Sequence, residues 1–318
     1  MKKIIFIVFF IPFFNFSQTF EKDLEEPLTN YNDASNDADF VEGTKIKQID
    51  IVHYGGGGLS KFDELDSIGK DSHVMRKITL QYNKNGKTVS FEKDYILFKE
   101  SKKFEYDNLN RLVKIIYSKW NREIKEYEQN EVFEHHDNVV KRHQYYKNDL
   151  EEISCSAQYY FNENNFLSEI KDHDTCFHFY PLTTYKYDEN GNVSFVDDTE
   201  MKYVYDKHNN LLSSGSFEAG SKTPSVSSKS TYNDQQQLID YRTFYEEKLD
   251  ERYEYEYEND LLSKKIVYLK NKKDHYFLYY YDTKGNWIRK ERYLYPESYV
   301  GVEEVWLVDI SIRNIQYW

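Results

Sequence analysis

The chain has 318 residues, of which 39% are hydrophobic and 18% aromatic, and its formal net charge at pH 7 is −13. A chain this acidic repels phosphate backbones and has no cluster of Lys and Arg interleaved with aromatic rings, which excludes nucleic acid as a partner. Because aliphatic residues are few, the core has to consist largely of Tyr and Phe, and this suits a thin or one-sided sheet.

Residues 1–17 have the order of a secretory signal peptide. Lys2 and Lys3 precede an apolar stretch from Ile4 to Phe14, and a short polar segment follows. About eleven apolar residues are too few to cross a hydrocarbon layer of ~30 Å, so a transmembrane anchor is the weaker alternative. We therefore expect export to the periplasm, the cell surface or the extracellular space, with a mature chain that begins near Gln18.

Residues 18–44 are acidic, rich in Asn and Asp, and without periodicity, which predicts a flexible leader. Residues 45–54 alternate in polarity and predict the first strand. Gly55 to Gly58 follow as a loop, and they lack the Gly-Lys-Ser/Thr ending of a phosphate-binding loop. We expect residues 45–318 to form one domain, because a repeat runs through most of it.

The repeat is a six-residue phrase: Tyr, then Asp or Asn, a short polar turn, and an apolar residue. Clear copies start at Tyr106, Tyr187, Tyr205, Tyr232 and Tyr281, weaker ones at Tyr82 and Phe161, a shortened one at Tyr257, and a degenerate one lies near His135. Gly or Asn fills the turn position that needs a positive φ, and polar and aromatic residues alternate on either side. This pattern predicts β-hairpins with one aromatic and one solvated face.

The phrases Tyr-x-Tyr-Asp-x-x-Gly-Asn at 185–192 and Tyr-Tyr-Tyr-Asp-Thr-Lys-Gly-Asn at 279–286 resemble the YD repeats of the Rhs family. That family occurs in bacterial toxin shells, wall-associated proteins and animal teneurins. The resemblance covers residues 78–295 and departs where Asn follows the Gly in place of Arg. It implies hairpins joined side by side into a long curling sheet. The chain departs from the toxins in having far fewer repeats than a closed shell and no conspicuous autoprotease or toxin segment after them.

Nine copies with two strands each predict on the order of eighteen strands, too many for an open sheet to stay flat. The expected fold is therefore an all-β antiparallel meander of hairpins in one strongly curved sheet, either an open half-pipe or a wide barrel with a water-filled lumen. An outer-membrane barrel is the alternative, and the terminal Trp318 suits it. However, residues 101–106 and 250–256 supply Tyr and charge where lipid requires apolar residues, so membrane insertion is not expected.

The two cysteines, Cys155 and Cys176, flank the turn at 162–165, and an exported chain favours a disulfide between them over two free thiols. Asp174 and His178 alternate with Cys176 and have metal-ligand chemistry, but a bonded Cys176 beside an aromatic face is the simpler interpretation. His135, His136 and His143 are interpreted as surface strand residues.

Trp120, Trp287 and Trp306 are candidates for stacking on a ligand, with burial in the core as the alternative for each ring. The stretch 213–230 carries eight Ser and a Pro and predicts an exposed loop.

Motifs of nucleophilic or zinc catalysis are missing from the sequence, so no catalytic, cofactor-binding or metal-binding residue is assigned. The function expected from the sequence is an exported, non-catalytic repeat scaffold that binds a glycan or an envelope protein. The alternatives are an outer-membrane barrel and a hydrolase that uses a pair of carboxylates. The sequence leaves the oligomeric state open.

Overall fold

The computed structural model describes residues 45–55, 74–95, 98–121, 127–146, 155–172, 182–188, 191–296 and 305–318. The signal peptide and leader predicted for residues 1–44 lie outside these ranges. Within them every regular element is a β-strand, and the expectation of an all-β antiparallel meander is confirmed. The strands are β1 (Ile46–Gly55), β2 (Val74–Tyr82), β3 (Thr88–Tyr95), β4 (Phe98–Tyr106), β5 (Leu112–Asn121), β6 (Tyr127–His136), β7 (Val139–Tyr146), β8 (Cys155–Phe161), β9 (Leu167–Asp172), β10 (Leu182–Tyr187), β11 (Val193–Val196), β12 (Thr199–Tyr205), β13 (Leu211–Phe217), β14 (Val226–Tyr232), β15 (Leu238–Tyr245), β16 (Lys248–Glu258), β17 (Leu261–Leu269), β18 (Lys272–Tyr281), β19 (Trp287–Leu294) and β20 (Trp306–Tyr317).

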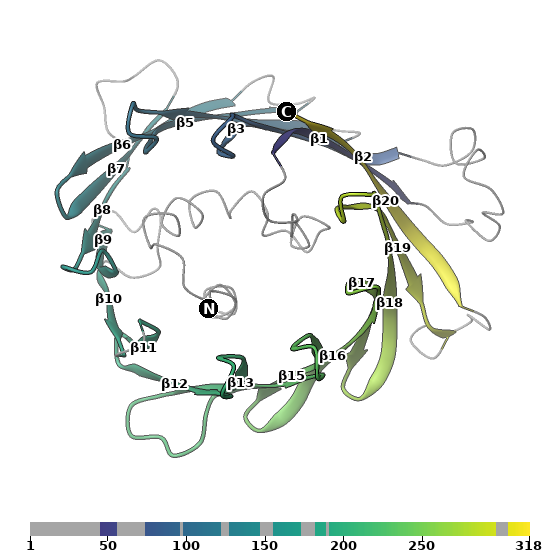
Figure 1. Ribbon diagram of the computed structural model, residues 1–318. Helices are drawn as coiled ribbons and strands as arrows, with labels where there is room; N and C mark the ends of the chain where they lie inside the picture. Colours follow the sequence, from purple (N-terminus) through teal and green to yellow (C-terminus); the bar gives the residue numbers. More distant parts are fainter. Residues whose placement is uncertain are drawn as a thin grey trace. The chain divides into compact units, whose positions relative to one another are not determined.

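The chain divides into two compact units. Among the described residues, the first unit holds β4 to β11, the second holds β1, β2 and β13 to β20, and the division cuts β3 and β12. In the first unit each strand from β4 to β12 pairs antiparallel with the next. In the second unit the pairing runs from β13 to β20 and continues from β20 to β1 and β2 (Figure 1).

The pairing of the last strand with the first decides between the two expected forms of the sheet. Ile49 of β1 lies opposite Ile315 of β20, and on its other edge β1 pairs with β2. All twenty strands belong to one sheet. A meander whose last strand bonds to its first has the strand order of a closed barrel, so the open half-pipe is wrong.

Full copies of the Tyr-Asp phrase build the same hairpin turn. In the copy at Tyr281, the Asp282 Oδ1 accepts hydrogen bonds from the backbone N–H groups of Lys284 and Asn286, at 2.8 and 2.9 Å. Gly285, with φ 81°, takes the left-handed position between them. The same pair of side-chain bonds recurs at Asn83, Asp107, Asn162, Asp206 and Asn233. The second residue of the phrase therefore shapes the turn, since its side chain satisfies amides that the hairpin leaves unpaired.

The hydrogen bonds of the turn also favour the charged form of its Asp carboxyl, as Asp206 shows. The side-chain amide and backbone N–H of Asn210 donate to Asp206, and they hold the pKa of its carboxyl below the ordinary range although partial desolvation opposes them. The carboxylate form accepts these bonds and the protonated form accepts them less well. The turn thus keeps its charged form to lower pH than a free Asp would.

The Tyr that opens a copy joins its hairpin to the preceding one. Its hydroxyl donates to a backbone carbonyl at the start of an earlier strand, as Tyr187 does to Leu167 at 2.6 Å and Tyr281 to Leu262 at 2.8 Å. Equivalent bonds are made by Tyr106, Tyr232 and Tyr257. In the degenerate copy, His135 takes this place with its Nε2 at 2.7 Å from the Leu112 carbonyl oxygen. The hydroxyl of the repeated Tyr therefore links its hairpin to the preceding one.

Replacing Tyr281 by Phe keeps the ring and removes the hydroxyl that bonds to Leu262. We expect the free energy of unfolding to fall by about 1 kcal/mol, because the carbonyl loses its partner while the packing stays. Chemical unfolding followed by circular dichroism measures the change. A variant as stable as the parent chain would show that the hydroxyl does not tie the hairpins.

The Ser-rich stretch 213–230 is only in its middle the exposed loop that its composition predicts. Most of it forms β13 and β14, which pair from Ser213 opposite Lys229 to Ser216 opposite Val226. Ser214, Ser216 and Ser228 are buried, and the Ser214 and Ser228 hydroxyls lie 2.7 Å apart. Small hydroxyl side chains that bond to each other across two strands can be buried because they satisfy each other. The loop prediction is therefore wrong for residues 213–217 and 226–230, whereas residues 218–225 between the two strands do form a loop, of which 218–223 are exposed.

The sheet of the second unit has two different faces. Residues paired across strands share a face, so the registers place Tyr253 and Tyr255 on one face and Glu254 and Glu256 on the other. We call the first the ring face; it also carries Tyr241, Lys265, Val267, Phe277, Tyr279, Trp287, Lys290, Ile49, Ile51 and Arg313. We call the second the ionic face; it also carries Asp240, Arg242, Arg252, Lys264, Tyr276, Tyr280, Arg289, Glu291 and Tyr293.

A small core lies where β19, β20 and β1 meet. Ile310, with 0% of its surface exposed, and Leu307 form its centre, and Tyr54, Tyr293 and Ile312 pack against them. The side chains come from both ends of the chain. The closing seam, where β20 pairs with β1, is therefore held by apolar packing as well as by backbone hydrogen bonds.

Candidate functional site

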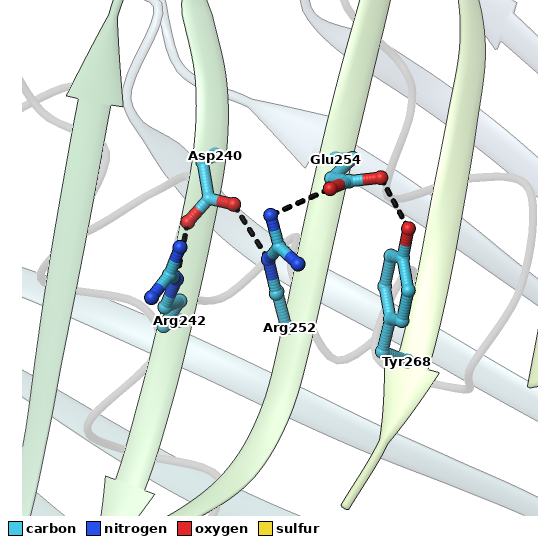
Figure 2. A network of polar contacts seen from close by, with 5 residues as sticks. All are labelled: Asp240, Arg242, Arg252, Glu254 and Tyr268. Atoms are coloured by element: carbon cyan, nitrogen blue, oxygen red, sulfur yellow. Dashed lines mark hydrogen bonds and ion pairs between the residues drawn. The ribbon is translucent and has the colours of Figure 1, made fainter. Parts of the chain in front are cut away.

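A chain of alternating charges crosses three strands of the ionic face (Figure 2). The Asp240 carboxylate accepts from Arg242 Nε with one oxygen and from Arg252 Nε with the other, both at 2.6 Å. An Arg252 Nη lies 2.5 Å from Glu254 Oε1, and the other oxygen of Glu254 accepts from the Tyr268 hydroxyl. We call these five residues the Arg252 network.

A second network on the ionic face surrounds Glu291, which is 3% exposed. Its Oε2 accepts hydrogen bonds from the hydroxyls of Tyr280 and Tyr293, at 3.0 and 2.9 Å, and Arg289 pairs with its other oxygen. The Tyr276 ring stacks on Tyr293, with centroids 4.9 Å apart and an interplanar angle of 8°. A buried carboxylate is tolerated here because three donors compensate its charge.

The first unit has a network of the same build on β6, β7 and β8. Arg142 Nη2 lies 2.8 Å from Glu131 Oε2, and its Nη1 donates to the Tyr159 hydroxyl at 3.3 Å. The same arrangement of an Arg, a carboxylate and a Tyr hydroxyl thus recurs in both units.

These networks have consequences for the hydrolase alternative. Asp240 and Glu254 lie directly opposite each other on neighbouring strands, but the guanidinium of Arg252 bonds to both. A carboxylate pair that works as acid and base needs oxygens that can reach the substrate. All four oxygens of Asp240 and Glu254 are engaged by Arg242, Arg252 or Tyr268, so the Arg252 network does not support that chemistry.

Two neighbouring turns of the repeat enclose an open cavity of about 590 Å³ in the second unit. Asp206, Lys207 and His208 line one side, and Tyr232, Asn233 and Asp234 line the other. Asn210 Nδ2 donates to Gln236 Oε1 at 2.5 Å and links the two turns. The carboxylate of Asp206 is engaged by its own turn, so the cavity lining is polar but largely satisfied.

The three Trp predicted to stack on a ligand lie on three different strands, β5, β19 and β20. Trp120 lies on β5 in the first unit and is 48% exposed. Trp287 is buried on the ring face of the second unit, with the Arg313 guanidinium 3.3 Å from its ring centroid. Trp306 begins β20, and its side chain lies outside the described residues.

Of the cysteine and histidine candidates, the structure describes Cys155, His135, His136 and His143. Cys155 is buried at the start of β8 and is disulfide-bonded. Cys176, with Asp174 and His178, lies outside the described residues, so the pairing of the two cysteines stays a prediction. The Nε2 atoms of His136 and His143 lie 3.6 and 3.9 Å from Glu134 Oε2. In the part of the chain that the structure describes, no group of three or more His, Cys, Asp or Glu is arranged to hold a metal ion.

One feature that the sequence reasoning missed is a row of cations over aromatic rings on the ring face. Lys265 lies over Tyr253, Lys290 over Phe277, and Arg313 over Trp287. These partners stand on neighbouring strands and are 12 to 26 positions apart in the chain. In the sequence, these cations are recognisable only as Lys or Arg residues that alternate with aromatic residues along a strand. This pattern does not tell which ring each cation contacts.

No known protein family matches the chain, and none of the curated proteins is similar to it. Among solved structures, the crystal structure of a porin-like protein from Bacteroides uniformis is similar at 10% sequence identity, with a TM-score of 0.36. The similarity covers 85% of this chain and 98% of that one. Over the described ranges, the structure has no helix with the length and apolar character to span a membrane.

The function expected from the sequence has to be corrected. The expectation of a repeat scaffold that does not insert into the membrane is wrong, because β20 pairs with β1 and the strand order is that of the alternative, a barrel. Taken strand by strand, the charges argue against contact with lipid. In the sheet, several of these charges meet an opposite charge on the next strand, as Arg252 meets Asp240.

Proposed function

We propose that this protein is an exported β-barrel of the bacterial outer membrane. The observation that carries the proposal is the pairing of β1 with β20. A sheet can cross hydrocarbon only when it is closed, because an open edge would leave backbone N–H and C=O groups without partners. Twenty antiparallel strands in one sheet also fit the even strand number of such barrels.

Strand length supports the proposal over much of the sheet. A strand that crosses the membrane at a tilt needs about 9–11 residues. Strands of at least that length, between 9 and 12 residues, are β1, β2, β4, β5, β6, β16, β17, β18 and β20. Strands β8 to β14 are shorter, with four to seven residues.

The pairing of charges gives further support. A lone charge at membrane depth is costly, whereas a charge that is hydrogen-bonded to an opposite charge on the next strand carries a smaller penalty. The Arg252 and Glu291 networks are of this kind. By strand number, the lumen falls between that of porins and that of the larger outer-membrane transporters, so we propose that it is filled with water.

Cell fractionation tests the proposal. The full chain with residues 1–17, expressed in a Gram-negative host, is expected in the outer-membrane fraction, resistant to alkaline carbonate and released by detergent. In detergent it should migrate differently on a gel before and after boiling, as closed barrels do. The matched control lacks residues 2–17 and should not reach the membrane. A mature chain that remains soluble and monodisperse without detergent would overturn the proposal.

A further inference from the structure

One end of the closing seam carries lysines and an exposed Trp. Strands β1, β2 and β20 are level with one another there, since Gln48 of β1 lies opposite Gln81 of β2 and Gln316 of β20. The three strands have 10, 9 and 12 residues, enough to cross the membrane in the barrel proposed above. Their ends then lie at the membrane surface, where lipid headgroups are the neighbours.

Trp318 follows β20 at this end and is 50% exposed. Its backbone N–H donates to the Lys45 carbonyl oxygen at 2.9 Å, which holds it beside the start of β1. The Nζ atoms of Lys47 and Lys84 lie 5.6 and 5.7 Å from the centroid of its ring. Two cations from separate segments therefore converge on one exposed ring.

The surroundings of Trp318 are cationic although the whole chain is acidic. Residues 45–49 and the turn at 83–87 have two lysines each and no Asp or Glu, and the turn opens with a neutral Asn. Lys47 and Lys84 are both exposed. Over the described ranges, neither ammonium group is paired with a carboxylate.

The acids of the adjoining strand and turn are engaged by neutral donors. Asp50 accepts hydrogen bonds from side chains of β1 and β2, both at 2.9 Å. Asp282 accepts from the Tyr317 hydroxyl at 2.5 Å and from two backbone amides of its own turn. The charges of Lys47 and Lys84 are therefore available to an external anion.

We propose that Lys47, Lys84 and Trp318 bind the headgroup of an anionic phospholipid, with its phosphate at the two ammonium groups. Lysine binds phosphate as a point charge, and Trp favours the membrane interface because its ring is apolar and its N–H is polar. A zwitterionic headgroup is disfavoured, because its own cation would meet the lysines. The site rests on the proposed function, since it needs a bilayer at this end of the strands.

Native mass spectrometry of the detergent-purified full chain, titrated with phosphatidylglycerol, tests the site. The double variant Lys47→Gln with Lys84→Gln is expected to bind the lipid at least about tenfold more weakly. The matched control is Lys270→Gln with Lys272→Gln, which removes two exposed lysines at the turn between β17 and β18, at the opposite end of the strands. Equal affinities of the two double variants would overturn the site.

Two other ligands test the chemistry of the headgroup. Phosphatidylcholine is expected to bind at least about fivefold more weakly than phosphatidylglycerol, because it has no net charge. Inorganic phosphate at the concentration of the lipid should not displace it. Phosphatidylcholine that binds as tightly, or displacement by inorganic phosphate, would overturn an anionic phospholipid as the ligand.

Failure of the site and failure of the proposed function give different results. A chain that is soluble without detergent overturns both, and fractionation shows this before any lipid is added. A membrane-inserted chain whose two double variants bind phosphatidylglycerol equally overturns the site alone. A membrane-inserted chain that loses affinity only with Lys47 and Lys84 supports both.

Discussion

Replacing Arg252 by Ala is expected to lower the free energy of unfolding by about 2 kcal/mol. Its guanidinium bonds to Asp240 and Glu254, which lie directly opposite each other on β15 and β16. Without it, two carboxylates face each other across the strands and repel. Urea unfolding followed by circular dichroism, in detergent where the protein requires it, measures the loss.

Arg242 provides the matched control. It lies at the end of the same network, its side chain is 45% exposed, and Asp240 keeps its bond to Arg252 when Arg242 is removed. Replacing Arg242 by Ala should therefore cost less than about 0.5 kcal/mol. Equal losses for the two variants would show that the central position of Arg252 between the carboxylates has no energetic consequence.

Replacing Ile310 by Ala is expected to have the larger effect, a loss of about 3 kcal/mol. Ile310 is fully buried in the small core formed by Leu307, Tyr54, Tyr293 and Ile312. The cavity left behind cannot easily collapse, because its walls belong to three hydrogen-bonded strands. Since those strands include β1 and β20, the variant also tests how much the closing seam contributes to stability.

Chemical unfolding measures this loss, and Ile312→Ala serves for comparison. Ile312 belongs to the same cluster but is only partly buried, so its truncation should cost about 1 kcal/mol. The order of the two losses matters more than their absolute size. If Ile312→Ala destabilised the protein more than Ile310→Ala, the packing at the seam would differ from the one described.

The turns of the repeat could be predicted from the sequence because their interactions are local. Asp282 bonds to amides two and four positions further along the chain, and Gly285 between them has the one backbone conformation that the turn requires. The alternation of Tyr and Glu at 253–256 is equally local, since successive side chains of a strand point to opposite faces. Repetition of such phrases predicted an antiparallel meander.

The Ser-rich stretch shows where composition misleads. Ser213 to Ser216 have no propensity for a core strand, and the sequence predicts a loop there. Their burial depends on hydroxyl partners on β14, and Ser228 is fourteen positions from Ser214. A partner at that distance is invisible until the register of the two strands is known.

The amino-acid order thus determined the hairpins, their turns and the two-faced strands, because each depends on contacts within a few residues. Only the tertiary structure decided that the sheet closes and which charges meet. His53 Nδ1 lies 2.8 Å from Ser311 Oγ across 258 positions of sequence, and no local pattern reports such a contact. Bulges such as the one between Glu256 and Tyr257 shift the register by a residue, so cross-strand partners like Arg252 and Asp240 follow from the assembled sheet.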